Sequence, residues 1–172
     1  MDVKDDIIPR KALFALSKYK ELNFSPDGKY ISYIAEKDNK SYIYIYIVDS
    51  DDPDNIITTI DIKCGNCNYA WGYNNHILYL EREASTNNNQ LYSYDIKTKQ
   101  TKLLIPDKNL TAKLIAASLK NPNEVLIGLK QTDQTYFDIY SFNLTDYSKK
   151  LVLKNDKFWN FLFDNNLTRV SY

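Results

Sequence analysis

Few side chains in this sequence could carry chemistry. They are the only histidine, His76, a pair of cysteines, Cys64 and Cys67, and the carboxylates of Glu81 and Glu83. A serine hydrolase of the α/β type needs a Gly-x-Ser-x-Gly turn, and none of the four glycines flanks a serine in that way. His76 follows a turn at the start of an expected strand, so we interpret it as a surface or rim residue and not as a general base. We therefore predict no catalytic residue.

The two cysteines have the spacing of a zinc half-site or of a redox-active pair. A structural zinc site needs four ligands, and only His76 could join Cys64 and Cys67 without recruiting carboxylates. A redox pair would open a helix behind a β-α-β unit, and no helical pattern follows Cys67. We therefore expect two free thiols in a reducing cytosol, and we predict neither a metal nor a cofactor.

Two acidic segments are expected at turns or strand ends. Residues 49–55 are rich in aspartate, but the segment lacks the glycine and the terminal glutamate of a calcium loop, so a solvated turn is the better interpretation. Glu81-Arg82-Glu83 closes another expected strand, and we interpret it as a strand-end charge cluster. Neither segment changes the prediction that the chain has no metal site.

The element that positions these residues is a repeated hairpin, most clearly marked at Ser25-Pro26-Asp27-Gly28. Proline presets φ for the second position of a tight turn, aspartate can bond its own backbone, and glycine accepts the positive φ that closes the turn. The residues after the turn alternate and are rich in tyrosine and isoleucine. This pattern predicts a hairpin between a strand ending at Phe24 and one beginning at Lys29.

The same pattern recurs along the chain. Ile31 corresponds to Ile77, then to Val125 and Leu167, at separations of 46, 48 and 42 residues. A period of 40 to 50 residues containing four short strands is typical of β-propeller blades. In the segment 42–48, tyrosine and isoleucine alternate, so both faces of that strand should be covered, which favours a propeller over an antiparallel sandwich.

We therefore predict an all-β fold, an incomplete β-propeller of about three and a half four-stranded antiparallel blades in an open arc. The blades should span about residues 20–62, 66–106, 110–154 and, incompletely, 156–172. The last is expected to contribute two strands, Phe158–Phe163 and Leu167–Tyr172. Residues 1–18 should form a cap segment with a short helix within Ile7–Leu16, because Pro9 suits a first helical turn and apolar residues follow on one side.

Composition limits the partners and the compartment. The chain has 172 residues, with 22 basic and 22 acidic side chains, so the basic field expected of a nucleic-acid-binding protein is missing. No apolar run is long enough to span a bilayer, and the first six residues are polar. We expect no nucleic acid, no membrane and a cytoplasmic location.

The sequence resembles a known family, the prolyl oligopeptidase family of serine peptidases. It is most similar to the acylaminoacyl-peptidase and dipeptidyl-aminopeptidase branch. The resemblance covers almost the whole chain. It rests on motifs that occur in the family's order: Ile8-Pro9-Arg10 with Leu13-Phe14, Phe24 to Tyr33, Trp71 before Ile77-Leu78-Tyr79, Leu91 to Ile96, Asn123 to Ile127, Phe137 to Leu144, and Trp159-Asn160-Phe161. The chain departs from the family's usual turns at residues 83–89 and 130–132.

The resemblance implies a role and partners. In this family the propeller covers the cleft of an α/β-hydrolase domain that follows it in this branch, and it admits short peptide substrates. The chain is thus expected to be a non-catalytic amino-terminal propeller fragment, not itself an enzyme, whose partners are a missing peptidase catalytic domain or further copies that bind through open blade faces. Glu81-Arg82-Glu83 faintly resembles the glutamate pair with which dipeptidyl peptidases hold a substrate's amine. The alternative is a free-standing TolB-like propeller module that binds a protein or peptide.

Overall fold

The computed structural model describes residues 18–48, 56–63 and 68–171, and these form fourteen β-strands and no helix. The all-β prediction is confirmed. The helix expected within Ile7–Leu16, the acidic turn at 49–55 and the cysteine pair lie outside the described residues.

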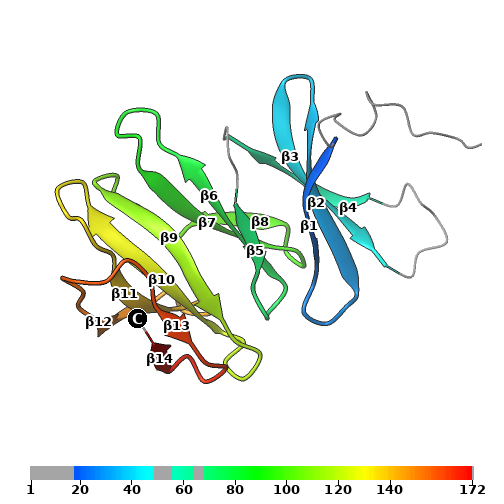
Figure 1. Cartoon of the computed structure of the whole chain (residues 1–172). Helices are drawn as coiled ribbons and strands as arrows, with labels where there is room; N and C mark the ends of the chain where they lie inside the picture. The colour runs from blue at the N-terminus through cyan, green and yellow to red at the C-terminus, as the bar shows by residue number, and fades with distance from the viewer. Residues whose placement is uncertain (1–17, 49–55, 64–67, 172) are drawn as a thin grey trace, which may run out of the picture.

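Twelve of the strands form three four-stranded antiparallel sheets, and in each sheet the spatial order of the strands follows the chain. We call them the first, second and third blades (Figure 1). The first blade contains β1 (Tyr19–Phe24), β2 (Tyr30–Lys37), β3 (Lys40–Ile47) and β4 (Ile56–Ile62). The second contains β5 (Tyr69–Trp71), β6 (His76–Arg82), β7 (Asn89–Asp95) and β8 (Gln100–Leu103). The third contains β9 (Leu110–Ala117), β10 (Glu124–Gln131), β11 (Asp138–Asn143) and β12 (Lys149–Leu153).

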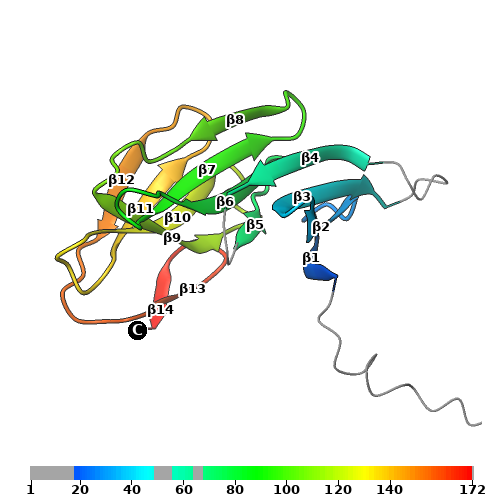
Figure 2. The same ribbon diagram turned by 90° about the horizontal axis from the view of Figure 1, so that it is seen from above.

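A two-stranded sheet of β13 (Leu162–Phe163) and β14 (Arg169–Ser171) follows the third blade. The three blades lie side by side in an open arc, and the two-stranded sheet lies against the third blade (Figure 2). Each blade is a local antiparallel meander, which is the repeating unit of a propeller. The expected incomplete propeller is confirmed.

The first strand of the last sheet is shorter than the predicted Phe158–Phe163. The Asn155 side chain occupies the backbone groups that a longer strand would need. Its Oδ1 accepts hydrogen bonds from the amides of Lys157 at 3.2 Å and Phe158 at 2.9 Å, while Nδ2 donates to the Phe158 carbonyl at 2.8 Å. Because these groups are already bonded to a side chain, strand pairing begins only at Leu162.

The turn that links β1 and β2 has the predicted geometry. Gly28 has a φ of 71°, and its amide donates to the Ser25 carbonyl at 2.9 Å. Ser25 Oγ donates to Asp27 Oδ1 at 2.7 Å and accepts from the Tyr30 amide at 2.9 Å. These polar contacts fix the turn and set the register in which Phe24 opposes Ile31.

Gly28→Val should lower the free energy of unfolding by about 1 to 3 kcal/mol, because a β-branched residue resists positive φ. No atom lies within 4 Å of a Cβ built on Gly28, so a clash at the Cβ position contributes nothing and the effect comes from the positive φ. Urea unfolding measures the change. Gly28→Asn is the matched control and should cost less, because asparagine tolerates this region. Equal losses for the two variants would contradict this explanation.

Apolar side chains fill the two spaces between neighbouring blades. Between the first and second blades, Ile43 and Ile45 are fully buried against residues that include Trp71 and Ile77. Between the second and third blades, Leu78, Leu91, Val125, Ile127 and Phe142 form a second cluster. The second blade is therefore covered on both faces.

The outer face of the first blade is different. It carries Tyr33, Tyr44 and Tyr46, whose rings stack with centroids 5.5 Å apart for each pair that includes Tyr33. The hydroxyls of Tyr33 and Tyr46 lie 2.7 Å apart. These side chains remain partly exposed, and no other sheet of the described chain packs on them. The expectation that both faces of β3 are covered is thus wrong for the described part of the chain, because the arc ends at this blade.

Candidate functional site

The described candidate residues all lie in the second blade. Along β6, Ile77 and Tyr79 face the first blade, whereas Leu78 and Leu80 face the third. Side chains alternate along a strand, so His76 lies on the face that packs toward the third blade. The placement of this strand therefore decides which neighbours each candidate meets.

His76 is buried, with only 8% of its surface exposed, so its interpretation as a surface or rim residue is wrong. His76 is the first residue of β6, as expected, but it lies on the face that packs toward the third blade. Nδ1 lies 2.9 Å from Ser93 Oγ in the neighbouring strand β7. Burial lowers the pKa of His76 below its ordinary value, although the charge of Asp95 acts in the opposite direction. The imidazole is therefore neutral at pH 7.

His76, Ser93 and Asp95 do not form a hydrolytic triad. Ser93 is 2% exposed, so a peptide carbonyl has no access to its hydroxyl. Asp95 Oδ1 accepts hydrogen bonds from the backbone amides of Lys97 at 2.8 Å and Thr98 at 3.4 Å, which stabilises the turn after β7. The serine and the aspartate thus serve packing and turn geometry, and the arrangement does not present a nucleophile.

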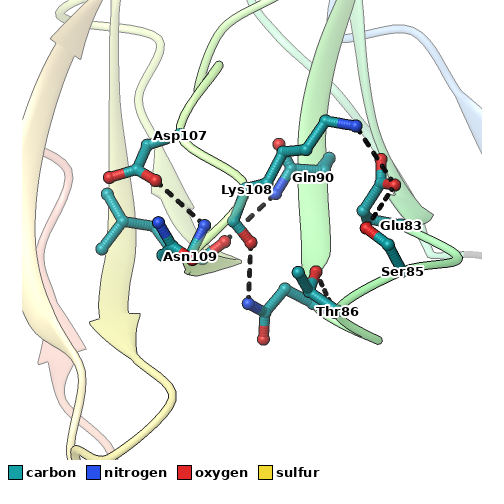
Figure 3. A network of polar contacts seen from close by, with 9 residues as sticks. Glu83, Ser85, Thr86, Gln90, Asp107, Lys108 and Asn109 are labelled. Carbon is teal, nitrogen blue, oxygen red and sulfur yellow. Dashed lines mark hydrogen bonds and ion pairs between the residues drawn. The ribbon is translucent and has the colours of Figure 1, made fainter.

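The carboxylates of Glu81 and Glu83 bind residues on opposite sides of the second blade. Glu81 Oε1 accepts from the backbone amide of Lys63 at 3.1 Å, on the side of the first blade. Glu83 Oε1 accepts from Ser85 Oγ at 3.0 Å and lies 3.3 Å from Lys108 Nζ, on the side of the third blade (Figure 3). Hydrogen bonds from Ser85 and Lys108 lower the pKa of Glu83. The two carboxylates are separately engaged and do not converge on one ligand amine.

The Glu83 contact belongs to a network that sequence reasoning missed (Figure 3). Asn88 Nδ2 donates to the Lys108 carbonyl at 2.9 Å, and Gln90 Nε2 donates to the Leu110 carbonyl at 3.1 Å. The network fastens the turn between β6 and β7 to the connection that enters the third blade. The departure from the family's usual turn at residues 83–89 therefore has a structural use here. The run Asn87-Asn88-Asn89-Gln90 is the signal that could have pointed to it, because buried amides need hydrogen-bond partners.

Within the described ranges, no group of three or more histidine, cysteine, aspartate or glutamate side chains could hold a metal ion. The same part of the chain contains no helix that is long and apolar enough to cross a membrane. The sequence expectation for the cysteine pair is not tested, because residues 64–67 lie outside the described part.

Two curated proteins are similar to this chain in sequence. Dipeptidyl aminopeptidase BIII of Pseudoxanthomonas mexicana is 33% identical over 153 residues, which are 88% of this chain and 22% of that protein. Dipeptidyl peptidase family member 6 of Caenorhabditis elegans is 29% identical over 184 aligned positions, covering 94% of this chain and 23% of that protein. The chain thus spans less than a quarter of the length of these relatives. No family model matches it.

Solved structures show the same fold at low identity. TolB from Acinetobacter baumannii has a TM-score of 0.57 at 15% identity, over 87% of this chain and 36% of that one. The β-propeller domain of the Trilobed protease from Pyrococcus furiosus has a TM-score of 0.53 at 13% identity, over 81% of this chain and 44% of that one. With the sequence relatives, these matches confirm the expected resemblance to the propeller portion of a peptidase.

Proposed function

From its resemblance to the propeller portion of prolyl-oligopeptidase-family peptidases, we propose that this chain is the amino-terminal propeller part of such a peptidase and has no catalysis of its own. The observation that carries the proposal is the 33% identity to 22% of a dipeptidyl aminopeptidase, spread over 88% of this chain. The burial of Ser93 and the separate engagement of Glu81 and Glu83 support the non-catalytic part.

The proposed role is to cover a catalytic cleft and to restrict access to it to short peptides. A rigid set of packed blades suits this role, because packed interiors deform little and hold the edge of an opening in place. The continuous apolar clusters on both faces of the second blade support such rigidity. The hydrolase domain that would be covered, and the peptide substrate, belong to the proposal.

We predict no peptidase activity from the purified 172-residue chain. A fluorophosphonate probe should label no serine, and aminoacyl-nitroanilide hydrolysis should stay at the buffer background. His76→Ala should change neither readout, because the ring is bonded to a buried serine that no substrate reaches. Hydrolysis that co-purifies with the chain and disappears in a serine or histidine variant would contradict the proposal.

A chimera tests the positive part of the proposal. This chain replaces the matched segment of Dipeptidyl aminopeptidase BIII, and a deletion of that segment is the control. We expect the chimera to fold and to hydrolyse substrates of the parent, whereas the deletion should lose either its fold or its size selection. If the chimera folds and hydrolyses substrates no better than the deletion, this chain does not occupy the position of the matched segment in a peptidase.

The proposed partners follow from the uncovered ends of the arc. Leu162 and Trp159 are 68% and 72% exposed near one end, and the tyrosine face of the first blade lies at the other. A peptidase catalytic domain or a second copy could cover these surfaces. A free-standing TolB-like module that binds a protein or peptide is the alternative. The cytoplasmic location rests only on the sequence expectation, and cell fractionation tests it.

A further inference from the structure

A cleft of about 400 Å³ lies beside His76, on the side of the second blade that faces the third. That volume lies within the range of small-molecule sites. Ser93 and Asp95 of β7 and Lys102 of β8 line it from one blade, and Tyr147, from the turn between β11 and β12, lines it from the other. The proposed peptidase role does not use this cleft.

One polar atom in the wall of the cleft has capacity to bind a ligand. His76 is more than nine-tenths buried, and its Nδ1 is bonded to Ser93. Within the described part of the chain, Nε2 has no hydrogen-bond partner. Among the described residues, only Gln90 Oε1 is a fully buried side-chain polar atom without a partner, so His76 Nε2 is accessible from the cleft and can bond to a ligand there.

The cleft also contains one charge of each sign. Burial opposes ionisation of Asp95, but hydrogen bonds from the Lys97 and Thr98 amides hold its pKa below the ordinary value, so it is a carboxylate at pH 7. The Lys102 ammonium lies 3.3 Å from the centroid of the Tyr147 ring, a cation-π contact that places the charge in the cleft wall. Among the described residues, neither Asp95 nor Lys102 belongs to an ion pair.

These charges select the class of ligand. The Asp95 carboxylate would repel a simple anion, and the Lys102 ammonium would repel a simple cation. A ligand with both signs satisfies both. Asp95 pairs with Gln100 across β7 and β8, so Lys102, two residues further, is its diagonal neighbour, at about 7 to 8 Å between backbones. A small molecule that carries an ammonium and a carboxylate can offer one group to Asp95 and the other to Lys102, since both side chains line the same cleft.

We propose that the cleft binds a small zwitterion of the α-amino-acid class. The ligand's ammonium contacts Asp95, its carboxylate contacts Lys102, and His76 Nε2 makes a third polar contact. The apolar side chain of the ligand packs against the ring of Tyr147. The site is independent of the proposed peptidase role, because it lies between two blades and needs no hydrolase domain.

Binding is measured on the unmodified 172-residue chain by equilibrium dialysis with radiolabelled L-leucine. His76 is the only histidine, so its imidazole NMR signals report on the site without ambiguity. We expect saturable binding and a saturable shift of those signals. Competition by N-acetyl-L-leucine, which lacks the ammonium, and by L-leucinamide, which lacks the carboxylate, should be at least about tenfold weaker, because each loses one charge-assisted hydrogen bond. No saturable binding up to about 10 mM, or equal competition by a blocked derivative, would overturn the proposal.

Two variants assign the charges. Asp95→Asn should weaken binding of L-leucine about tenfold without weakening N-acetyl-L-leucine, and Lys102→Gln should weaken L-leucine without weakening L-leucinamide. Lys97→Gln, an exposed lysine beside the site, is the matched control and should bind as the unmodified chain does. Folded variants that bind L-leucine unchanged would refute the assignment. If a variant fails to fold, the comparison of the three ligands on the unmodified chain still decides whether the cleft needs both charges of the ligand.

Discussion

Phe142→Ala should lower the free energy of unfolding by about 3 to 5 kcal/mol, the usual range for truncating a buried phenylalanine. Phe142 is 2% exposed and belongs to the cluster between the second and third blades, with Leu78 and Leu91 among its members. Its ring also meets Tyr147 edge to face, at a centroid distance of 6.5 Å. Removing the ring leaves a cavity in the interface where the second and third blades pack against each other. Urea unfolding followed by tryptophan fluorescence measures the loss.

Leu119→Ala is the matched control, because Leu119 lies after β9 in the same blade and is 67% exposed. Its effect should stay within about 0.5 kcal/mol. If the two substitutions cost the same, Phe142 would not lie in a packed interface, and the arrangement of the second and third blades would be wrong.

Trp71→Ala should cost a similar amount, about 3 to 5 kcal/mol, at the other interface. The Trp71 ring stacks on Tyr30 of the first blade, with centroids 6.0 Å apart and planes inclined by 8°. Its Nε1 donates to Ser32 Oγ at 2.8 Å, and Ser32 is fully buried. The side chain thus joins the first two blades both by packing and by a hydrogen bond.

Trp71→Phe separates the two contributions. The variant keeps an aromatic ring in the interface but removes the N–H donor, so it should cost about 1 to 3 kcal/mol. Thermal melts and urea unfolding of both variants give the comparison. A Phe variant as unstable as the Ala variant would show that ring packing contributes little, contrary to the stacked geometry.

The strands and their order could be predicted from the sequence because the signals are local. Alternation of tyrosine and isoleucine predicts β3, and the Ser25-Pro26-Asp27-Gly28 turn predicts the β1–β2 hairpin, since each depends only on residues a few positions apart. The repeat then predicts three blades, because each blade is a local meander whose strands are neighbours in the chain.

The rest depends on side-chain contacts that patterns of strands and turns do not reveal. The burial of His76 is set by Ser93 and by the neighbouring third blade, neither of which a local pattern reveals. The role of Glu83 depends on Lys108, 25 residues away. The late start of β13 depends on the side chain of Asn155, which competes with strand pairing. The contacts of His76 and Glu83 join residues 17 and 25 positions apart, whereas Asn155 acts three positions away through side-chain bonding that strand and turn patterns do not reveal.

The backbone conformation of the turns is also only partly predictable from residue type. Asn75 and Asn87 adopt positive φ, as turn-forming asparagines commonly do. Tyr147 also has a positive φ, of 63°, although its residue type disfavours that region. Its amide donates to the Asn143 carbonyl at 3.0 Å, and Asn143 Oδ1 accepts from the Thr145 amide at 2.7 Å, so hydrogen bonds hold the turn. Residue type alone would not place Tyr147 in the cleft.

The chain forms an open arc of blades, and we propose that a partner or a second copy covers its end blades. Each blade buries its apolar surface only against its neighbours, so the outer faces of an arc remain bare. Size-exclusion chromatography with light scattering at micromolar concentration, combined with binding of a hydrophobic dye, tests this most directly. We predict that the purified chain self-associates or binds the dye. A stable, monodisperse monomer with the chain mass of 20.1 kDa and no dye binding would show that the end blades need no cover.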